Sequence, residues 1–170
     1  MPRVKRSGSG ENLANAGRAE TRQETERLQM IMDHARSLGD LHGLGAWWLF
    51  VVDNAKVRAG VCNFVMQRIS ISRHLILNDD IPFVKVENVI LHEIAHALVG
   101  SDAGHGPEWK AKAIELGCDG KQYHTLQLAK PRGFKSCDCG EVYYTVHRLR
   151  NGAPRMCVFC GSLVTYKQMA

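Results

Sequence analysis

Apolar residues recur at helical spacing in the segment that begins at Ala19. They fall on one face of a helix, at Leu28, Ile31, Met32, Ala35 and Leu38. Gly39 follows the last of them, and glycine commonly ends a helix. The pattern therefore predicts a packing helix over Ala19–Leu38.

Three short stretches with strand character come next. They are rich in β-branched and aromatic residues, and their bounds are Ala46–Asp53, Val57–Phe64 and Arg68–Ser72. Because only short polar turns join these stretches, we expect them to pair in sequence order as a small antiparallel sheet.

Two further helices follow the predicted strands. Asp79 or Asp80 is placed to cap the first of these helices, and Gly100 ends it. After a glycine-containing turn, Pro107 begins the second helix and Gly117 closes it.

The last third of the chain has a different pattern. A basic connector over residues 121–135 leads into a segment where apolar and polar positions alternate around two cysteine pairs. Asn151-Gly152 lies between the pairs and is typical of a tight hairpin turn. The fold class that we expect is α+β, in three parts: a disordered tail at 1–19, a domain of helices and a small sheet at 20–130, and a small β segment at 131–170.

Composition excludes several classes of protein. The 170 residues are 45% hydrophobic and 23% charged, which is typical of a globular chain and not of a disordered or fibrous one. The longest apolar run, Leu44–Val52, is too short to span a membrane, and the basic N-terminus has no apolar segment behind its charges. We therefore expect a cytoplasmic monomer in a reducing compartment, with no membrane partner.

Charge is distributed unevenly along the chain. Residues 121–170 have a net charge of +6, whereas residues 1–120 have a net charge of −1. A basic appendage on a nearly neutral body favours an acidic partner, with nucleic acid first and an acidic membrane surface second. The alternative is that the charge serves solubility alone.

The helix that ends at Gly100 carries the sequence HEIAH. His92 and His96 lie one turn apart on the same helix face, close enough to share one zinc ion. Glu93 is offset around the helix, where it can accept a proton from a zinc-bound water without ligating the metal. The alternative is structural: two buried histidines that form hydrogen bonds within an apolar helix.

A catalytic zinc takes three protein ligands, so a third donor is needed after the helix. His105 follows Gly100 and Gly104, which allow the chain to turn back over the helix. Other donors nearby in the sequence are Asp102, Glu108 and Glu115. We favour His105 as the third ligand, because Glu108 is explained by its favourable place in the first turn of a helix.

Four of the six cysteines form two close pairs. The pairs are Cys137 with Cys139 and Cys157 with Cys160. Four thiolates complete a tetrahedral zinc site with no position left for water, so this second zinc is expected to be structural. A redox dithiol or an iron–sulfur site is the alternative. The segment is too small to fold on a hydrophobic core alone, which favours a zinc ribbon.

The ribbon segment also mixes cations with aromatic residues. They are His147, Arg148, Arg150 and Arg155 beside Tyr143, Tyr144 and Phe159. Such a mixture suits phosphate contacts and base stacking on exposed single strands. A solvated hairpin whose aromatic rings pack a small core explains the mixture equally well.

Several motifs together resemble the SprT-like zinc metallopeptidase family, which includes DNA-dependent proteases. The matching segments are AGVCN at 59–63, RISIS at 68–72, ILHEIAHALVG at 90–100, HGPEWK at 105–110, LG at 116–117 and the two cysteine pairs. The resemblance implies a zincin-like minimal metalloprotease domain followed by a Cys₄ zinc ribbon. It also implies that His92, His96 and His105 ligate the catalytic zinc and that Glu93 is the catalytic glutamate.

The leading hypothesis is a zinc-dependent endopeptidase with one catalytic and one structural zinc. Zinc lowers the pKa of its bound water, and Glu93 takes the proton as the water attacks a peptide carbonyl. Trp109, Tyr123 or His124 could reach the cleft and stabilise the oxyanion. The resemblance further implies that the ribbon binds DNA and that the substrates are proteins bound or crosslinked to it, which places the protein at the nucleoid or in a nucleus.

Two alternatives remain open from the sequence. One is a nucleic-acid-binding regulatory protein with little or no peptidase activity, because fold alone does not establish activity. The other is a hydrolase of the same type that acts on a substrate other than a protein. The intact Glu93 argues against the first alternative, since a structural zinc needs no such carboxylate.

Overall fold

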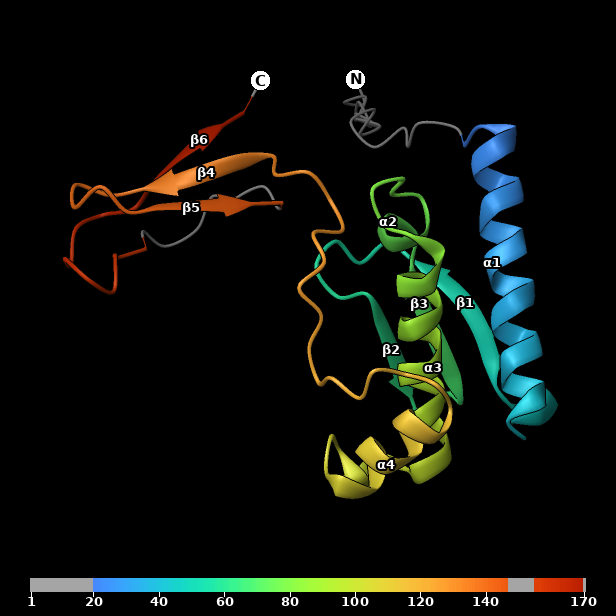
Figure 1. Ribbon diagram of the computed structural model, residues 1–170. Helices are drawn as coiled ribbons and strands as arrows, with labels where there is room; N and C mark the ends of the chain where they lie inside the picture. The colour runs from blue at the N-terminus through green and yellow to red at the C-terminus, as the bar shows by residue number, and fades with distance from the viewer. Residues whose placement is uncertain (1–19, 147–154, 170) are drawn as a thin grey trace, which may run out of the picture.

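The computed structural model describes residues 20–146 and 155–169 (Figure 1). The predicted tail at 1–19 and the predicted turn at Asn151-Gly152 lie outside the described residues, as do His147, Arg148 and Arg150.

The first helix, α1 (Arg22–Leu41), runs three residues further than its apolar pattern predicts. Its N-terminus is fixed by a capping box in which Thr21 and Glu24 satisfy each other's backbone N–H groups. The buried face is the one that the spacing predicts, with Leu28, Ile31, Met32 and Ala35 in the core. Gly39 lies inside α1 and does not stop it.

Gly39 has a packing role within α1. A Cβ atom at this position would lie 2.7 Å from the Phe50 ring, so only a residue without a side chain lets the helix lie against this ring. The close approach of α1 to the sheet therefore explains why residue 39 is glycine. The sequence pattern instead predicts that this glycine ends the helix.

The first sheet has a strand order that corrects the sequence prediction. Its strands are β1 (Leu49–Asp53), β2 (Gly60–Asn63) and β3 (Arg68–Ser72), in the spatial order β1-β3-β2. β2 pairs with β3 antiparallel, but β1 pairs with β3 in parallel. The prediction of a purely antiparallel sheet, with strands paired in sequence order, is therefore wrong.

The connection between β1 and β2 explains this order. It passes the end of β3 at Ser72, whose backbone N–H donates to the Ala59 carbonyl at 2.8 Å and whose hydroxyl donates to the Ala55 carbonyl. The loop is thus held over the end of β3 and delivers β2 to the far edge of the sheet. The short polar turn alone predicts a hairpin between β1 and β2. The hydrogen bonds to Ser72, which is distant in the sequence, cannot be predicted from that turn.

Helices α2 (Arg73–Ile76), α3 (Phe83–Val99) and α4 (Pro107–Glu115) complete the first part of the chain. α3 begins after Pro82, which is its N-cap, so the predicted cap at Asp79 or Asp80 is wrong. Asp79 is instead paired with Arg27, and the backbone N–H of Asp80 donates to the Asn78 side chain at 3.0 Å.

The second sheet is small and wholly antiparallel. Its strands are β4 (Gly133–Ser136), β5 (Val142–Thr145) and β6 (Thr165–Gln168), in the order β5-β4-β6. Figure 1 shows it beyond the extended segment that follows α4. The described residues thus form a mixed α and β fold with two small sheets. Among them, no helix is both long and apolar enough to cross a bilayer.

Replacing Gly39 by alanine tests the contact between α1 and the sheet. Alanine has the higher helix propensity by about 1 kcal/mol, yet we expect Gly39→Ala to destabilise the fold by about 1–2 kcal/mol, because the new methyl group overlaps the Phe50 ring. Urea unfolding would measure the change. The exposed Ser37→Ala on the same helix is the control and should be neutral or slightly stabilising. A gain in stability for Gly39→Ala would contradict the close packing.

Candidate functional site

Helix α3 presents two histidines from one face, as their spacing predicts. The ring centroids of His92 and His96 lie 5.0 Å apart. The Nε2 atom of His105 lies 3.1 Å from that of His92 and 3.0 Å from that of His96. The three ring nitrogens therefore converge on one point. Neutral imidazoles cannot all donate to one another there, whereas one cation accepts the lone pairs of all three.

A sharp reversal after α3 brings His105 back over the helix. α3 ends at Gly100, which has a φ of 91°, and Gly104 has a φ of 49°. Both values lie in the left-handed region that favours glycine. The short helix η3 (Ser101–Ala103) lies between them. These two glycines are therefore the local reason that a residue nine positions after His96 can reach it.

Trp109 holds the three imidazoles from behind. Its ring centroid lies 4.6 Å from those of His92 and His105, and it stacks on the His96 ring at 5.1 Å. Only 1% of its surface is exposed. Trp109 is thus a buried support for the three imidazole rings. It is not among the residues that line the cleft, so the expectation that it reaches the cleft is wrong.

Burial sets the protonation state of the histidines. Desolvation lowers the pKa of His92 and His96 to about 4. The proximity of His105 lowers both pKa values further, and the proximity of His96 also lowers that of His92. Desolvation also lowers the pKa of His105. At neutral pH the rings are therefore uncharged, which is the form that binds a metal ion.

Glu93 lies beside the three histidines without joining them. The described groups that could hold a metal ion include no carboxylate with these histidines, so Asp102, Glu108 and Glu115 are not placed as ligands. Glu93 is only 7% exposed, and burial raises its pKa to about 7. The positive charge of Arg58 and a hydrogen bond from the Cys62 backbone N–H act in the opposite direction.

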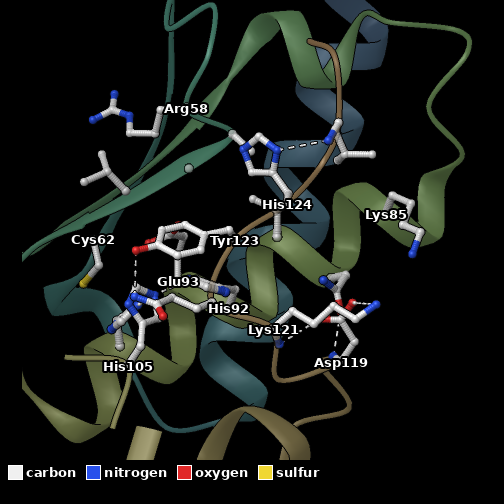
Figure 2. A pocket seen from close by; sticks show the side chains of 18 of the residues that line it. Arg58, Cys62, Lys85, His92, Glu93, His105, Asp119, Lys121, Tyr123 and His124 are labelled. Carbon is white, nitrogen blue, oxygen red and sulfur yellow. Dashed lines mark hydrogen bonds and ion pairs between the residues drawn. The ribbon is translucent and has the colours of Figure 1, made fainter. Parts of the chain in front are cut away.

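A cleft of about 710 Å³ opens in front of this cluster. Figure 2 shows Glu93, His92 and His105 close together in this cleft, with Tyr123 and His124 above them in this view. Tyr123 is 77% exposed, and its ring centroid lies 6.4 Å from that of His105. Of the three residues considered for contact with a reacting group, Tyr123 and His124 therefore line the cleft.

One wall of the cleft is an extended segment over residues 119–128. Side chains of Asn88 and Asn78 fix its two ends. The Asp119 backbone N–H donates to the Asn88 side chain at 2.8 Å. The Asn78 side chain donates to the Gln127 carbonyl at 3.1 Å.

From the sequence we expect Tyr123 and His124 to reach the cleft, but the basic composition of residues 121–135 predicts a connector and not a segment that is anchored as a wall. Leu128 is buried and Leu126 packs against the same hydrophobic cluster. The signal that could have identified an anchored segment was this alternation of leucines.

The four paired cysteines also come together. Their Sγ atoms all lie within 4.8 Å of one another, with 3.8 Å between Cys139 and Cys157 and between Cys160 and Cys137. Gly140 and Gly161 follow the two pairs with φ angles of 85° and 70°, which turn each knuckle back on itself.

Hydrogen bonds from the side chain and backbone of Ser162 lower the pKa of Cys160 to about 6. A thiolate is therefore favoured at this position. Four converging sulfur atoms suit a closed tetrahedral metal site.

The aromatic residues in and around the second sheet are largely on the surface. Tyr143, Tyr144 and Phe159 are exposed, as is Arg155. They are accessible for contact, and the Tyr144 ring also packs edge-on against Phe134 at 6.5 Å.

Comparison with known proteins identifies relatives of this chain. The model of the SprT-like family matches residues 43–127. The "Protein SprT" of Escherichia fergusonii is 36% identical over 94 residues, which are 48% of this chain and 57% of that protein. The "Protein SprT" of Shigella boydii is 32% identical over 121 residues, which are 64% of this chain and 72% of that protein.

The match spans 57% of the length of the first of these relatives, and no solved structure matches the fold significantly. The matched region contains the HEIAH helix, His105 and the cleft wall up to residue 127. The chain therefore belongs to the SprT-like family.

Proposed function

We propose that this protein is a zinc-dependent endopeptidase with a zincin-like catalytic domain, and that it cleaves proteins bound or crosslinked to DNA. The observation that carries the proposal is the convergence of three uncharged histidine nitrogens beside a buried carboxylate in an open cleft. Structural metal sites are closed by a fourth protein ligand, whereas three ligands leave a position for a water molecule or a substrate.

The donor set fits zinc. His92, His96 and His105 would hold the metal, which supplies a Lewis acid that polarises a carbonyl group and makes water more acidic. In this proposal Glu93 accepts the proton of the attacking water and passes it to the leaving amine, and its burial beside the histidines supports that role. Trp109 keeps the rings in place, and the exposed Tyr123 hydroxyl can donate to the oxygen that gains negative charge.

The nucleic-acid part of the proposal depends on the second sheet. Residues 121–170 have a net charge of +6, and exposed aromatic rings accompany the cations. Cations bind phosphates and aromatic rings stack on unpaired bases, so the ribbon is suited to exposed single-stranded DNA. The Cys₄ cluster would hold the structural zinc that fixes this sheet.

Zinc content tests the two sites separately. We expect two zinc ions per chain, one at each cluster, and we expect His96→Ala to leave one, because two histidines alone hold zinc weakly. Elemental analysis of the purified protein measures this content. His74→Ala, at a histidine outside both clusters, is the control and should keep two. Two zinc ions in His96→Ala would contradict the assignment of the histidine cluster.

Replacing Glu93 tests the peptidase proposal. Glu93→Gln keeps the shape of the side chain but cannot accept a proton, so we expect cleavage of a DNA-bound basic protein to fall by about 10²–10⁴-fold. Gel analysis of cleavage with the zinc-loaded protein measures this loss. Glu108→Gln, at an exposed glutamate on α4, is the matched control and should keep full activity.

The same experiment with and without single-stranded DNA tests the ribbon. Cleavage by the wild-type protein alone, enhanced by DNA, supports both parts of the proposal. Absence of cleavage by wild type and variant, with zinc and DNA still bound, would contradict it and leave the nucleic-acid-binding regulatory protein as the explanation.

The pH dependence of cleavage tests the electrostatic environment of Glu93. Only the ionised carboxylate accepts a proton, so kcat/KM should fall as the pH drops and Glu93 becomes protonated. Burial raises the pKa of Glu93 to about 7 in the metal-free chain, and a bound zinc cation would move this fall to lower pH. Arg58 lowers this pKa, so Arg58→Gln should move the loss of activity to higher pH. Lys85→Gln, at another cation of the cleft, is the control. Equal profiles for both variants would contradict this role of Arg58.

A further inference from the structure

The first residue of β2, Gly60, lies directly against the Glu93 side chain. A Cβ atom at Gly60 would lie 2.8 Å from both Cγ and Oε1 of Glu93 and 3.1 Å from its Cδ. Such contacts are too short for a real side chain. The backbone of Gly60 does not occupy the left-handed region, so its conformation does not demand glycine. Glycine is required at this position because the Glu93 side chain approaches so closely.

The strand cannot retreat from Glu93 because it is fixed from the other side. Gly60 and Cys62 are paired with Ile71 and Ile69 of β3, and both isoleucines are fully buried. The residue before β2, Ala59, accepts the hydrogen bond from Ser72. The position of β2 is therefore set by the sheet and not by the glutamate.

The strand also contributes a hydrogen bond to the Glu93 carboxylate. The Cys62 backbone N–H donates to the carboxylate, two residues along the strand from Gly60. Gly60 thus provides the space that the side chain fills, and Cys62 provides the donor that its oxygen needs. Together Gly60 and Cys62 restrict the Glu93 carboxylate to one position beside the three histidines.

We propose that Gly60 is a positioning residue for Glu93, because its missing side chain lets the β2 backbone hold the carboxylate beside the histidine cluster. This inference rests on the proposed function of Glu93 as the proton acceptor. A methyl group at Gly60 meets the flexible end of a side chain and not a backbone, so the carboxylate moves while the strand stays. The substitution therefore affects the chemistry more than the fold.

Gly60→Ala in the zinc-loaded protein tests the inference through the steady-state constants. A displacement of a reacting group by about 1 Å can cost about 10²-fold in rate, so we expect kcat to fall by about 10- to 100-fold. We expect the zinc content to stay close to that of the wild type, because the histidines do not change. Gly60 lines the cleft, but its added methyl group faces Glu93, so we expect KM to change less than kcat. An unchanged kcat would overturn the proposal.

Gly43→Ala is the matched control for this substitution. Gly43 lies after α1 with a φ of 84° and has no neighbouring atom within 4 Å of the added Cβ. Alanine there strains the backbone and should lower the melting temperature without changing kcat. A fall in kcat for Gly43→Ala as large as that for Gly60→Ala would mean that general destabilisation causes the loss, and it would overturn the proposal.

A double-mutant cycle with Glu93→Ala gives a readout that does not depend on activity. We expect Gly60→Ala to lower the melting temperature in the wild-type background. In the Glu93→Ala background the methyl group meets no carboxylate, so the same change should lower it less or raise it. Equal shifts in both backgrounds would overturn the contact. Absence of cleavage by the wild-type chain would overturn the proposed function, while this cycle would still decide whether Gly60 holds Glu93.

Discussion

The arrangement around helix α3 depends on one constraint: three imidazole nitrogens must stay uncharged and point at one place. Two of them come from adjacent turns of α3, with Nε2 atoms that lie 3.0 and 3.1 Å from that of His105. The third requires a chain reversal with two glycines in the left-handed region, and a buried tryptophan supports all three rings. The reversal after α3 therefore brings His105 back to this helix, and Trp109 on α4 holds the three rings together.

Much of the site could be predicted from the sequence because its signals are local. The spacing of His92 and His96 on a helix, the glycines before His105 and the paired cysteines each correspond to a geometry that the structure contains. Local patterns also gave the positions of the main helices and of the first three strands, to within a few residues.

The parts that could not be predicted depend on contacts between distant residues. The parallel pairing of β1 with β3 follows from the anchor at Ser72, which lies thirteen or more residues beyond the loop that it holds. The cleft wall depends on Asn78 and Asn88, far from it in the sequence. A side chain at Gly39 would overlap Phe50, and one at Gly60 would overlap Glu93. Both neighbours are distant in the sequence. The apolar pattern therefore wrongly predicts a helix end at Gly39 and predicts no role for Gly60.

The order of strands in the first sheet has a consequence for association. It leaves β2 at an edge, where unpaired backbone groups can pair with a strand of another molecule. α3 packs along β2, and the Glu93 carboxylate takes up the N–H of Cys62. The Glu93 carboxylate thus also occupies part of this sheet edge, and one fewer backbone N–H of β2 is free to pair with a strand of another molecule.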